Sequence, residues 1–261
     1  MRIDIGGSRW DQITAIDERR WARNVRPLLN RQIAPIMERM ESARETPELL
    51  LQEVSKIKGD QLEAVFRKEY ERTGQRYFEL IADQAKNKKL DPDDPYFNMV
   101  SRWVESFVGT RIKTITETSR RQARKLITEI IEDGIEDGLG ADKVGERIET
   151  EFPKRWRKNN RFRAMAIART ETVTAANWAS KEGAKKVAQE LGIELYKEWV
   201  PAIDNRTRED HADMVGKTVR MNDDFMVGGE LMKHPCAPGS SAGNVVNCRC
   251  RLAYITSDEF E

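Results

Sequence analysis

Apolar residues recur at helical spacing through the first half of this 261-residue chain. Between residues 8 and 45 they lie three to five positions apart, which is the period of one helix face. Pro27 and Pro35 interrupt this stretch and predict a kink or a break. The same pattern predicts three further helices, over residues 47–57, 60–88 and 95–132. The first half is therefore predicted to be almost wholly helical.

Two residue patterns mark the ends of these helices. Thr46 and Pro47 suit the first positions of the helix predicted over 47–57. The prolines and aspartates of "LDPDDPYF" predict a turn before residue 95. Core packing explains the apolar stripes most simply, and helical arms that pack on a partner are the alternative, because the stripes are narrow and the charge content is high.

The pattern changes twice in the second half. The glycines and acids of "EDGIEDGLGADKVGERIETEFP" predict the end of the long helix and a short helix that Asp142 caps and Pro153 ends. A further helix is predicted to run to Gly192. After it the spacing becomes that of short strands and loops, with predicted elements "IELYKEWV" (strand), "REDHADMVG" (helix), "KTVRM" (strand), "GGELMKHPCAPGSSAGN" (loop) and "CRCRLAYIT" (strand).

These elements predict the α+β class, with a mostly helical N-terminal half followed by a small C-terminal α+β domain of a few short strands. The expected division is a helical region over residues 1–139, which carries partner contacts, and a domain over residues 140–261. In the last strand, Cys248, Cys250, Leu252 and Tyr254 are predicted to share one face.

Composition narrows the class of protein. Apolar residues make up 39% of the chain and charged residues 34%, which fits a real core beneath long, solvated helices. The net charge of +1 gives no global field toward nucleic acid, so a basic site must be local. The N-terminus lacks the apolar run of a signal peptide, and no apolar stretch approaches the roughly 20 residues of a membrane span. Three cysteines indicate a reducing compartment without a disulfide framework.

All cysteines and histidines fall between residues 211 and 250, which indicates a metal site. We expect His211, Cys236, Cys248 and Cys250 to bind one structural zinc, with His234 as the reserve ligand. The alternatives are buried, reduced thiols that only pack and, on weaker grounds, a redox pair. On an extended strand the two side chains of Cys-x-Cys would lie ~7 Å apart, so zinc would require the strand to pucker.

A basic run from residue 154 to residue 169 contains no acid. Two aromatics, Trp156 and Phe162, interleave with its cations, a pattern that suits phosphates and unstacked bases. The candidate nucleic-acid contacts are Arg155, Arg157, Lys158, Arg161 and Arg163. A solvated helix start and a basic face that docks on an acidic partner are the alternatives.

Two other groups of residues are candidates for a catalytic or structural polar site. His211 with Asp204 and Glu171 could run hydrolysis or nuclease chemistry, but no flanking motif supports it, and a histidine that holds a turn is the simpler interpretation. Arg169 lies on or beside an apolar stripe, so it needs a distant acidic or carbonyl partner, which we expect on the "DNRTRED" turn.

Taken together, the pieces resemble the C-terminal domain of the bacteriophage Mu F-like minor head proteins, the head-morphogenesis family. The shared pattern is "ARTET…N…W…D-x-RTR-x-x-H-x-x-x-x-G…F…HP…NCRC", which covers residues 140–255. The matching positions are Arg169, Thr170, Glu171, Asn177, Trp199, Asp204, Arg206, Thr207, Arg208, His211, Gly216, Phe225, Pro235, Asn247, Cys248, Arg249 and Cys250. Among these, Arg169, Thr170, Glu171, Asp204, Arg208 and Asn247 are expected to form a structural motif. Cys236 departs from the pattern, and is either incidental or completes a metal site that relatives lack.

The resemblance implies a minor component of a tailed-phage head, located in the head interior near the portal and in the host cytoplasm during assembly. The implied partners are the portal or major capsid protein, and double-stranded DNA that is packaged and ejected. No enzymatic activity is implied, since relatives with an enzyme domain carry it after this one, and the chain is expected to end without it. A DNA-binding protein ejected with the genome and a His211-based hydrolase or nuclease are the competing functions.

Overall fold

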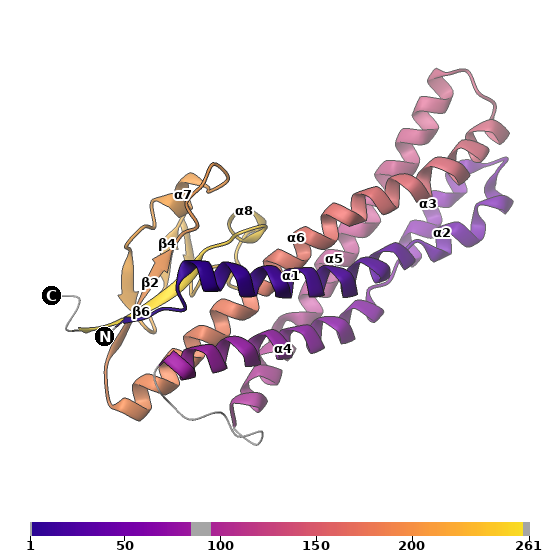
Figure 1. The fold of residues 1–261 in the computed structure, drawn as a ribbon. Coiled ribbons are helices and arrows are strands. Elements are labelled where there is room, and N and C mark those ends of the chain that lie inside the picture. The colour runs from indigo at the N-terminus through magenta and orange to yellow at the C-terminus, as the bar shows by residue number, and fades with distance from the viewer. Residues whose placement is uncertain (1, 85–94, 258–261) are drawn as a thin grey trace. The chain divides into compact units, whose positions relative to one another are not determined.

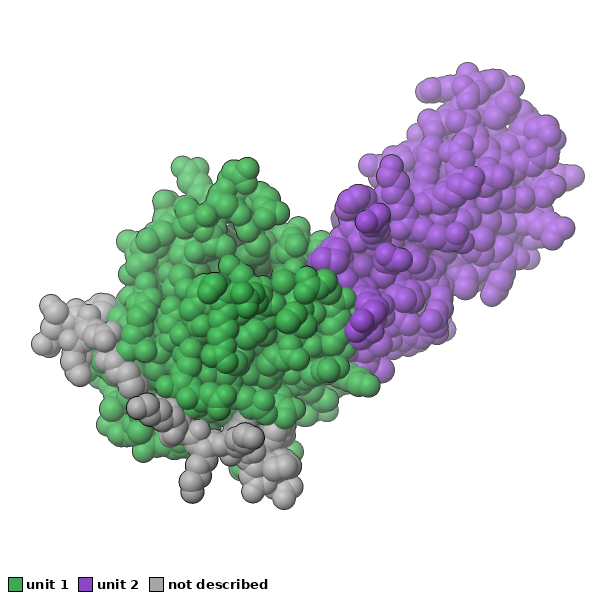
Figure 2. All heavy atoms as spheres, in the orientation of Figure 1, with its two compact units in different colours: residues 1–21, 67–106, 166–261 green, residues 22–66, 107–165 purple. Residues whose placement is uncertain are grey.

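The computed structural model describes residues 2–84 and 95–257. These residues form two compact units, each made of segments that are discontinuous in sequence (Figure 2). Unit 1 comprises residues 1–21, 67–106 and 166–261, and unit 2 comprises residues 22–66 and 107–165. The predicted boundary between residues 139 and 140 falls inside unit 2, and as a division into sequence domains it stays a prediction.

Helices dominate the first part of the chain, as predicted (Figure 1). The elements are α1 (Gly7–Arg31), α2 (Ala34–Arg39), η1 (Glu41–Ala43), η2 (Pro47–Leu49), α3 (Leu50–Glu53), η3 (Val54–Lys56), α4 (Asp60–Gln84), α5 (Pro95–Glu136) and α6 (Ala141–Leu191). The predicted break at Pro35 is confirmed, because α1 ends at Arg31 and α2 begins with this proline in its first turn. Most of the turn predicted at "LDPDDPYF" lies outside the described residues.

Unit 2 is helical, and its core is built by the predicted apolar stripes. Buried side chains from α2, α3, α5 and α6 form one cluster that includes Ile36, Ile127, Phe152 and Trp156. Gly134 lies so close to Val144 that a Cβ atom would come within 2.7 Å of it. This close approach lets α5 and α6 pack directly beside the turn that joins them.

One helix prediction in this unit is wrong. Pro153 does not end a short helix, because α6 continues through it to Leu191. A proline inside a helix removes one backbone hydrogen bond and costs about 3 kcal/mol. The flanking Phe152 and Trp156 are fully buried in the core of unit 2, and this packing offsets the loss.

Unit 1 combines helix segments with the sheets, so the predicted α+β class is confirmed. An antiparallel sheet has the order β1-β6-β2-β3, with β1 (Arg2–Ile3), β2 (Leu195–Val200), β3 (Thr218–Arg220) and β6 (Arg251–Thr256). Strands β4 (Phe225–Val227) and β5 (Glu230–Met232) form a separate hairpin. The short helices α7 (Glu209–Ala212) and α8 (Ala242–Val245) lie in the connections. Strands β2 and β6 run side by side in Figure 1 and pair from Leu195 with Thr256 to Val200 with Arg251.

Three details of the C-terminal prediction are corrected. The stretch predicted as a loop contains β5 and α8. The last strand begins at Arg251, so Cys248 and Cys250 precede it and do not share its face. Strand β1, which pairs with β6, comes from the N-terminus and carries too few residues for an alternating pattern.

Candidate metal centre

One face of α6 presents a row of buried polar side chains to the C-terminal segment. Thr170, Thr174, Asn177 and Ser180 are three or four positions apart, so they lie along one side of the helix. The Thr174 hydroxyl donates to the Cys236 carbonyl at 3.0 Å, and the Thr170 hydroxyl accepts from the Asn247 backbone N–H at 3.1 Å. Ser180 bonds the Tyr254 hydroxyl at 2.8 Å. This row holds the segment that contains all three cysteines against the helix.

Asn177 makes the central contacts of this row. Its Nδ2 donates to the Cys250 carbonyl at 3.0 Å, and its Oδ1 accepts from the Leu252 N–H at 3.1 Å. Replacing Asn177 with alanine leaves both backbone groups buried and unpaired, which costs about 1–3 kcal/mol for each. We expect Asn177→Ala to lower the free energy of unfolding by about 2–5 kcal/mol in denaturant titrations. An unchanged free energy would show that these bonds do not hold the segment.

A tight turn, closed by the hydrogen bond from the Cys248 N–H to the Val245 carbonyl at 3.2 Å, leads into the Cys-x-Cys sequence directly before β6. Asn247 has a φ of 59°, a left-handed conformation that bends the chain before Cys248. The Cys250 N–H then donates to the Cys248 sulfur at 3.4 Å. The two Sγ atoms therefore lie within 4.8 Å of each other, closer than on an extended strand. The predicted strand is absent at this point, so the two sulfurs approach each other without the pucker that such a strand would have needed.

His211 completes a group of three potential ligands. It lies on α7, and its Nδ1 is 3.6 Å from the Cys248 Sγ and 3.4 Å from the Cys250 Sγ. All three side chains are buried. The ring of Trp199 meets the imidazole edge-on with 5.7 Å between centroids and fixes its plane. The other nitrogen, Nε2, is buried without a hydrogen-bond partner among the described residues.

These distances suit a metal ion. Two ligands at the usual Zn–S and Zn–N lengths of a tetrahedral site are ~3.6 Å apart. Thiolate and imidazole are soft to borderline ligands, which excludes the oxygen-seeking Mg²⁺ and Ca²⁺ as preferred ions. The His211, Cys248 and Cys250 group can therefore hold a metal ion.

Cys236 and His234, the other two ligands considered from the sequence, differ in where their side chains point. Cys236 is buried, and its thiol donates to the Val245 carbonyl at 3.2 Å. The Val245 carbonyl also accepts the Cys248 backbone N–H at 3.2 Å. The neighbouring Cys236 thiol, together with burial, raises the pKa of the Cys248 thiol. The Cys236 sulfur lies outside the group formed by His211, Cys248 and Cys250. His234 points elsewhere, because its Nδ1 lies 3.0 Å from the Pro235 carbonyl. Burial lowers the pKa of His234 to about 3, so this imidazole is neutral.

The motif arginines hold the turns around this centre. Arg249 binds Asp204 through two hydrogen bonds of 2.6 and 2.7 Å. This pair holds the pKa of Asp204 well below its usual range. Arg208 donates to the Val246 carbonyl. Arg169 donates to Asn247 Oδ1 at 3.2 Å and pairs with Glu18 of α1 at 3.4 Å, so its expected partner on the "DNRTRED" turn is wrong.

The structure does not assemble the predicted hydrolase group. Glu171 is buried and accepts a hydrogen bond from the Tyr70 hydroxyl. Asp204 is occupied by Arg249, and the Nδ1 of His211 faces the two sulfurs. Each of the three side chains therefore has a separate structural role, and they do not converge on one reacting position.

Part of the predicted basic surface is engaged inside unit 2. Arg155 pairs with Glu151 at 2.8 Å and with Asp133 at 3.6 Å. Arg163 donates to Asn160 and Ser119 at 2.8 Å, and burial lowers its pKa to about 10. Trp156 is fully buried and cannot stack on a base.

The exposed cations of this helix lie on one stripe. Lys154, Arg157, Lys158 and Arg161 follow the spacing of a helix face and have no acidic partner in the described part of the chain. Phe162 continues the stripe with 68% of its surface exposed. We call these five residues the basic stripe. Sequence reasoning missed Lys154, which the helical period could have added.

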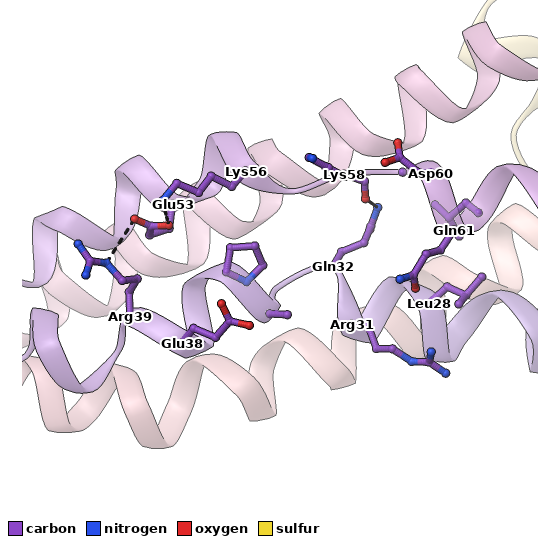
Figure 3. Close-up of a pocket in the computed structure, with 14 residues that line it drawn as sticks. Leu28, Arg31, Gln32, Glu38, Arg39, Glu53, Lys56, Lys58, Asp60 and Gln61 are labelled. Carbon is purple, nitrogen blue, oxygen red and sulfur yellow. Dashed lines mark hydrogen bonds and ion pairs between the residues drawn. The ribbon is translucent and has the colours of Figure 1, made fainter.

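Unit 2 also contains a groove of about 710 Å³ (Figure 3). Leu28, Pro35 and Leu62 supply apolar surface to it. Figure 3 shows Glu53 between Arg39 and Lys56, with which it pairs at 3.6 and 2.7 Å. The groove is therefore apolar in part and bordered by an internal charge network.

Comparisons with known proteins match the part of the chain that contains α6 and the cysteine turn. The family described as phage Mu protein F like protein matches residues 125–253. Minor head protein GP7 of Bacillus phage SPP1 is 32% identical over 125 residues, which are 46% of this chain and 35% of that protein. NAD(+)--arginine ADP-ribosyltransferase EFV of Enterococcus faecalis (strain ATCC 700802 / V583) is 35% identical over 92 residues, which are 35% of this chain and 18% of that protein.

The chain thus spans about a third or less of these two curated relatives. No solved structure matches it significantly. The family match contains the buried polar row of α6, the His211 helix and the cysteine turn, the three parts that together build the candidate metal centre. Residues 125–253 therefore belong to the phage Mu protein F like family.

Proposed function

We propose that this chain is a minor head protein of a tailed bacteriophage that acts in head morphogenesis, is associated with the portal, and resides in the head interior. The observation that carries the proposal is the family match over residues 125–253, which the relative named as a minor head protein supports. No helix of the described residues is long and apolar enough to cross a membrane.

Unit 2 supplies the proposed contacts with the portal or major capsid protein. The turn between α5 and α6 exposes Ile135 and Leu139, with 64% and 38% of their surfaces accessible. Gly138 adopts a φ of 70°, and the Leu139 N–H bonds the Gly134 carbonyl at 2.9 Å, so a Schellman motif holds this tip. A fixed apolar tip suits docking on another head protein better than a mobile loop, because little conformational entropy is lost on binding.

The basic stripe supports a contact with packaged DNA. Its cations are not neutralised by acids in the described part of the chain, and they follow one helix face. Contacts of this kind address phosphates and carry no sequence information. Of the residues expected from the sequence, Arg157, Lys158 and Arg161 remain in this proposal. Arg155 and Arg163 leave it, since they already bind groups of unit 2.

We propose zinc as the ion of the metal centre. Sulfur and imidazole ligands with tetrahedral spacing favour zinc among the ions that proteins use structurally. Protein purified without a chelator or a histidine tag is expected to contain about one zinc per chain by metal analysis. Removal of the ion by a strong chelator should lower the melting temperature, since an ion that binds only the folded state stabilises it. Metal-free protein with the same melting temperature in chelator would exclude zinc.

We propose no enzymatic activity for the described residues. The stretch shared with the ADP-ribosyltransferase is 18% of that protein, as expected for a module that occurs in longer chains. The residues predicted for a hydrolase do not converge, as described above. The second candidate function is that of a DNA-binding protein that is ejected with the genome. The basic stripe favours it, because a protein that leaves the head with the DNA needs a surface that binds DNA.

Disruption of the gene tests the proposed role in head morphogenesis. The disrupted phage should still synthesise its other head proteins but yield fewer infectious particles, and the intact gene supplied in trans should restore them. Normal yields without the gene would refute a role in assembly.

A further inference from the structure

We propose that Cys236 is the fourth ligand of the metal centre, so that the site is a closed clamp of three cysteines and one histidine. This inference rests on the proposed zinc site and deepens it. It assigns the ion a structural role, because four protein ligands leave no position for a reactive water.

The backbone of Cys236 is held in an unusual conformation. Its φ of 59° lies in the left-handed region, which costs a non-glycine residue about 1–3 kcal/mol. Two hydrogen bonds fix the conformation, one from Thr174 to the Cys236 carbonyl at 3.0 Å and one from the Ala237 N–H to the His234 carbonyl at 3.1 Å. A strained residue held in place from both sides indicates that its side chain has a role there.

The side chain of Cys236 lies at the edge of the three-ligand group, outside the set of atoms that are within 4.8 Å of one another. Its thiol is buried and donates to the Val245 carbonyl at 3.2 Å, and the same carbonyl accepts the backbone N–H of Cys248 at 3.2 Å. Rotation about its Cα–Cβ bond redirects the sulfur without moving the backbone. Binding of the ion would replace the weak bond from sulfur to Val245 with a metal–sulfur bond.

The alternatives for the fourth position fit less well. His234 is directed to the Pro235 carbonyl, so it would have to break a hydrogen bond and turn. The acids near His211 in sequence do not face the site, because Asp204 is bound to Arg249 and Glu209, Asp210 and Asp213 are exposed. A bound water would need polar neighbours in a site whose three known members are almost completely buried.

A closed clamp would join three segments of unit 1 directly through one ion. Cys236 belongs to the connection after β5, His211 to α7, and Cys248 and Cys250 to the segment before β6. The helices and strands in these connections are only three or four residues long, too short to be stable alone. The ion would add to the hydrogen bonds that Arg208, Arg249 and the Cys236 thiol already make between these segments.

X-ray absorption spectroscopy of the zinc-loaded full-length protein tests the inference without any substitution. Three sulfurs at about 2.3 Å and one nitrogen at about 2.0–2.1 Å are expected. A shell of two sulfurs and two light atoms would overturn the assignment of Cys236 but leave the zinc site in place. If no zinc binds at all, the proposed zinc site itself fails.

Substitution adds a second, independent readout. In cobalt-loaded protein, the sulfur-to-cobalt charge-transfer band of Cys236→Ser should fall by about one third, because one of three thiolates is lost. Its zinc affinity should fall by more than the roughly 10–100-fold that the loss of an outer partner costs. Ser180→Ala, which removes a bond from α6 to Tyr254 but touches neither Cys236 nor a ligand, is the matched control and should retain the full band. An unchanged band in Cys236→Ser would contradict the fourth-ligand role.

Discussion

Replacing Lys154, Arg157, Lys158 and Arg161 together with glutamine is expected to remove most of the affinity of this chain for duplex DNA. Each phosphate that a cation neutralises contributes about 0.9 to the slope of log affinity against log salt. The slope should therefore fall by about 3 to 4, and affinity at low salt by several orders of magnitude. All four side chains are exposed, so folding should be unaffected.

The physical reason for the large effect is that these cations pair with no acid among residues 2–84 and 95–257. The four residues span about 10 Å along α6, at a rise of 1.5 Å per residue, which is enough to follow neighbouring phosphates. Arg147→Gln is the matched control, because Arg147 lies on the same helix but pairs with Asp137 and Glu151 at 2.6 and 3.0 Å. It should change the slope by much less. Equal slopes for the parent and the fourfold variant, or no binding by the parent at low salt, would refute the DNA contact.

Replacing Arg20 with methionine is expected to lower the free energy of unfolding by about 3–5 kcal/mol. Arg20 lies buried in unit 1, donates to Glu69 at 2.6 Å and to Thr73 at 3.1 Å, and also pairs with Asp17. Asp17 and Glu69 are buried as well, so the loss of the guanidinium leaves Glu69 without its closest cation and Asp17 with Arg76 alone. Burial raises the pKa of Asp17, and Arg20 and Arg76 oppose this rise, so the loss of Arg20 should leave the buried carboxylate less stable.

Denaturant titration measures this change, and Arg19→Met provides the control. Arg19 neighbours Arg20 on α1 but is exposed, so its replacement should change stability by no more than about 0.5 kcal/mol. Similar stabilities for the two variants would show that the buried network contributes nothing to unit 1.

The helices could be predicted from sequence because their stripes are long and regular. The stretch 95–132 corresponds to α5 over Pro95–Glu136, and the break at Pro35 is present. The course of α6 through Pro153 could not be predicted, because the packing of Phe152 and Trp156 that offsets the proline is visible only in the fold. Each unit is built from segments that are far apart in the sequence, and the contacts between such segments cannot be predicted from a local residue pattern.

Only part of the candidate site could be predicted from the sequence. Clustering of cysteines and histidines in sequence identified His211, Cys248 and Cys250, which the structure brings together. The turn that does so depends on the left-handed conformation of Asn247, which sequence spacing does not reveal. The pairing of Arg155 with Asp133 on α5 and the burial of Trp156 likewise follow from helix pairing within unit 2, whereas the pair of Arg155 with Glu151 is an i,i+4 contact on α6 that the helical period could have predicted.

Binding to the portal tests the central claim, a head protein associated with the portal, most directly. Purified chain mixed with the portal ring of the same phage is expected to elute with the ring in size-exclusion chromatography. The double variant Ile135→Ser, Leu139→Ser should elute mainly alone, whereas Ile16→Ser, at an exposed position on α1 in unit 1, should behave like the parent. The account is contradicted if the parent chain elutes separately from the portal ring at low and at physiological salt.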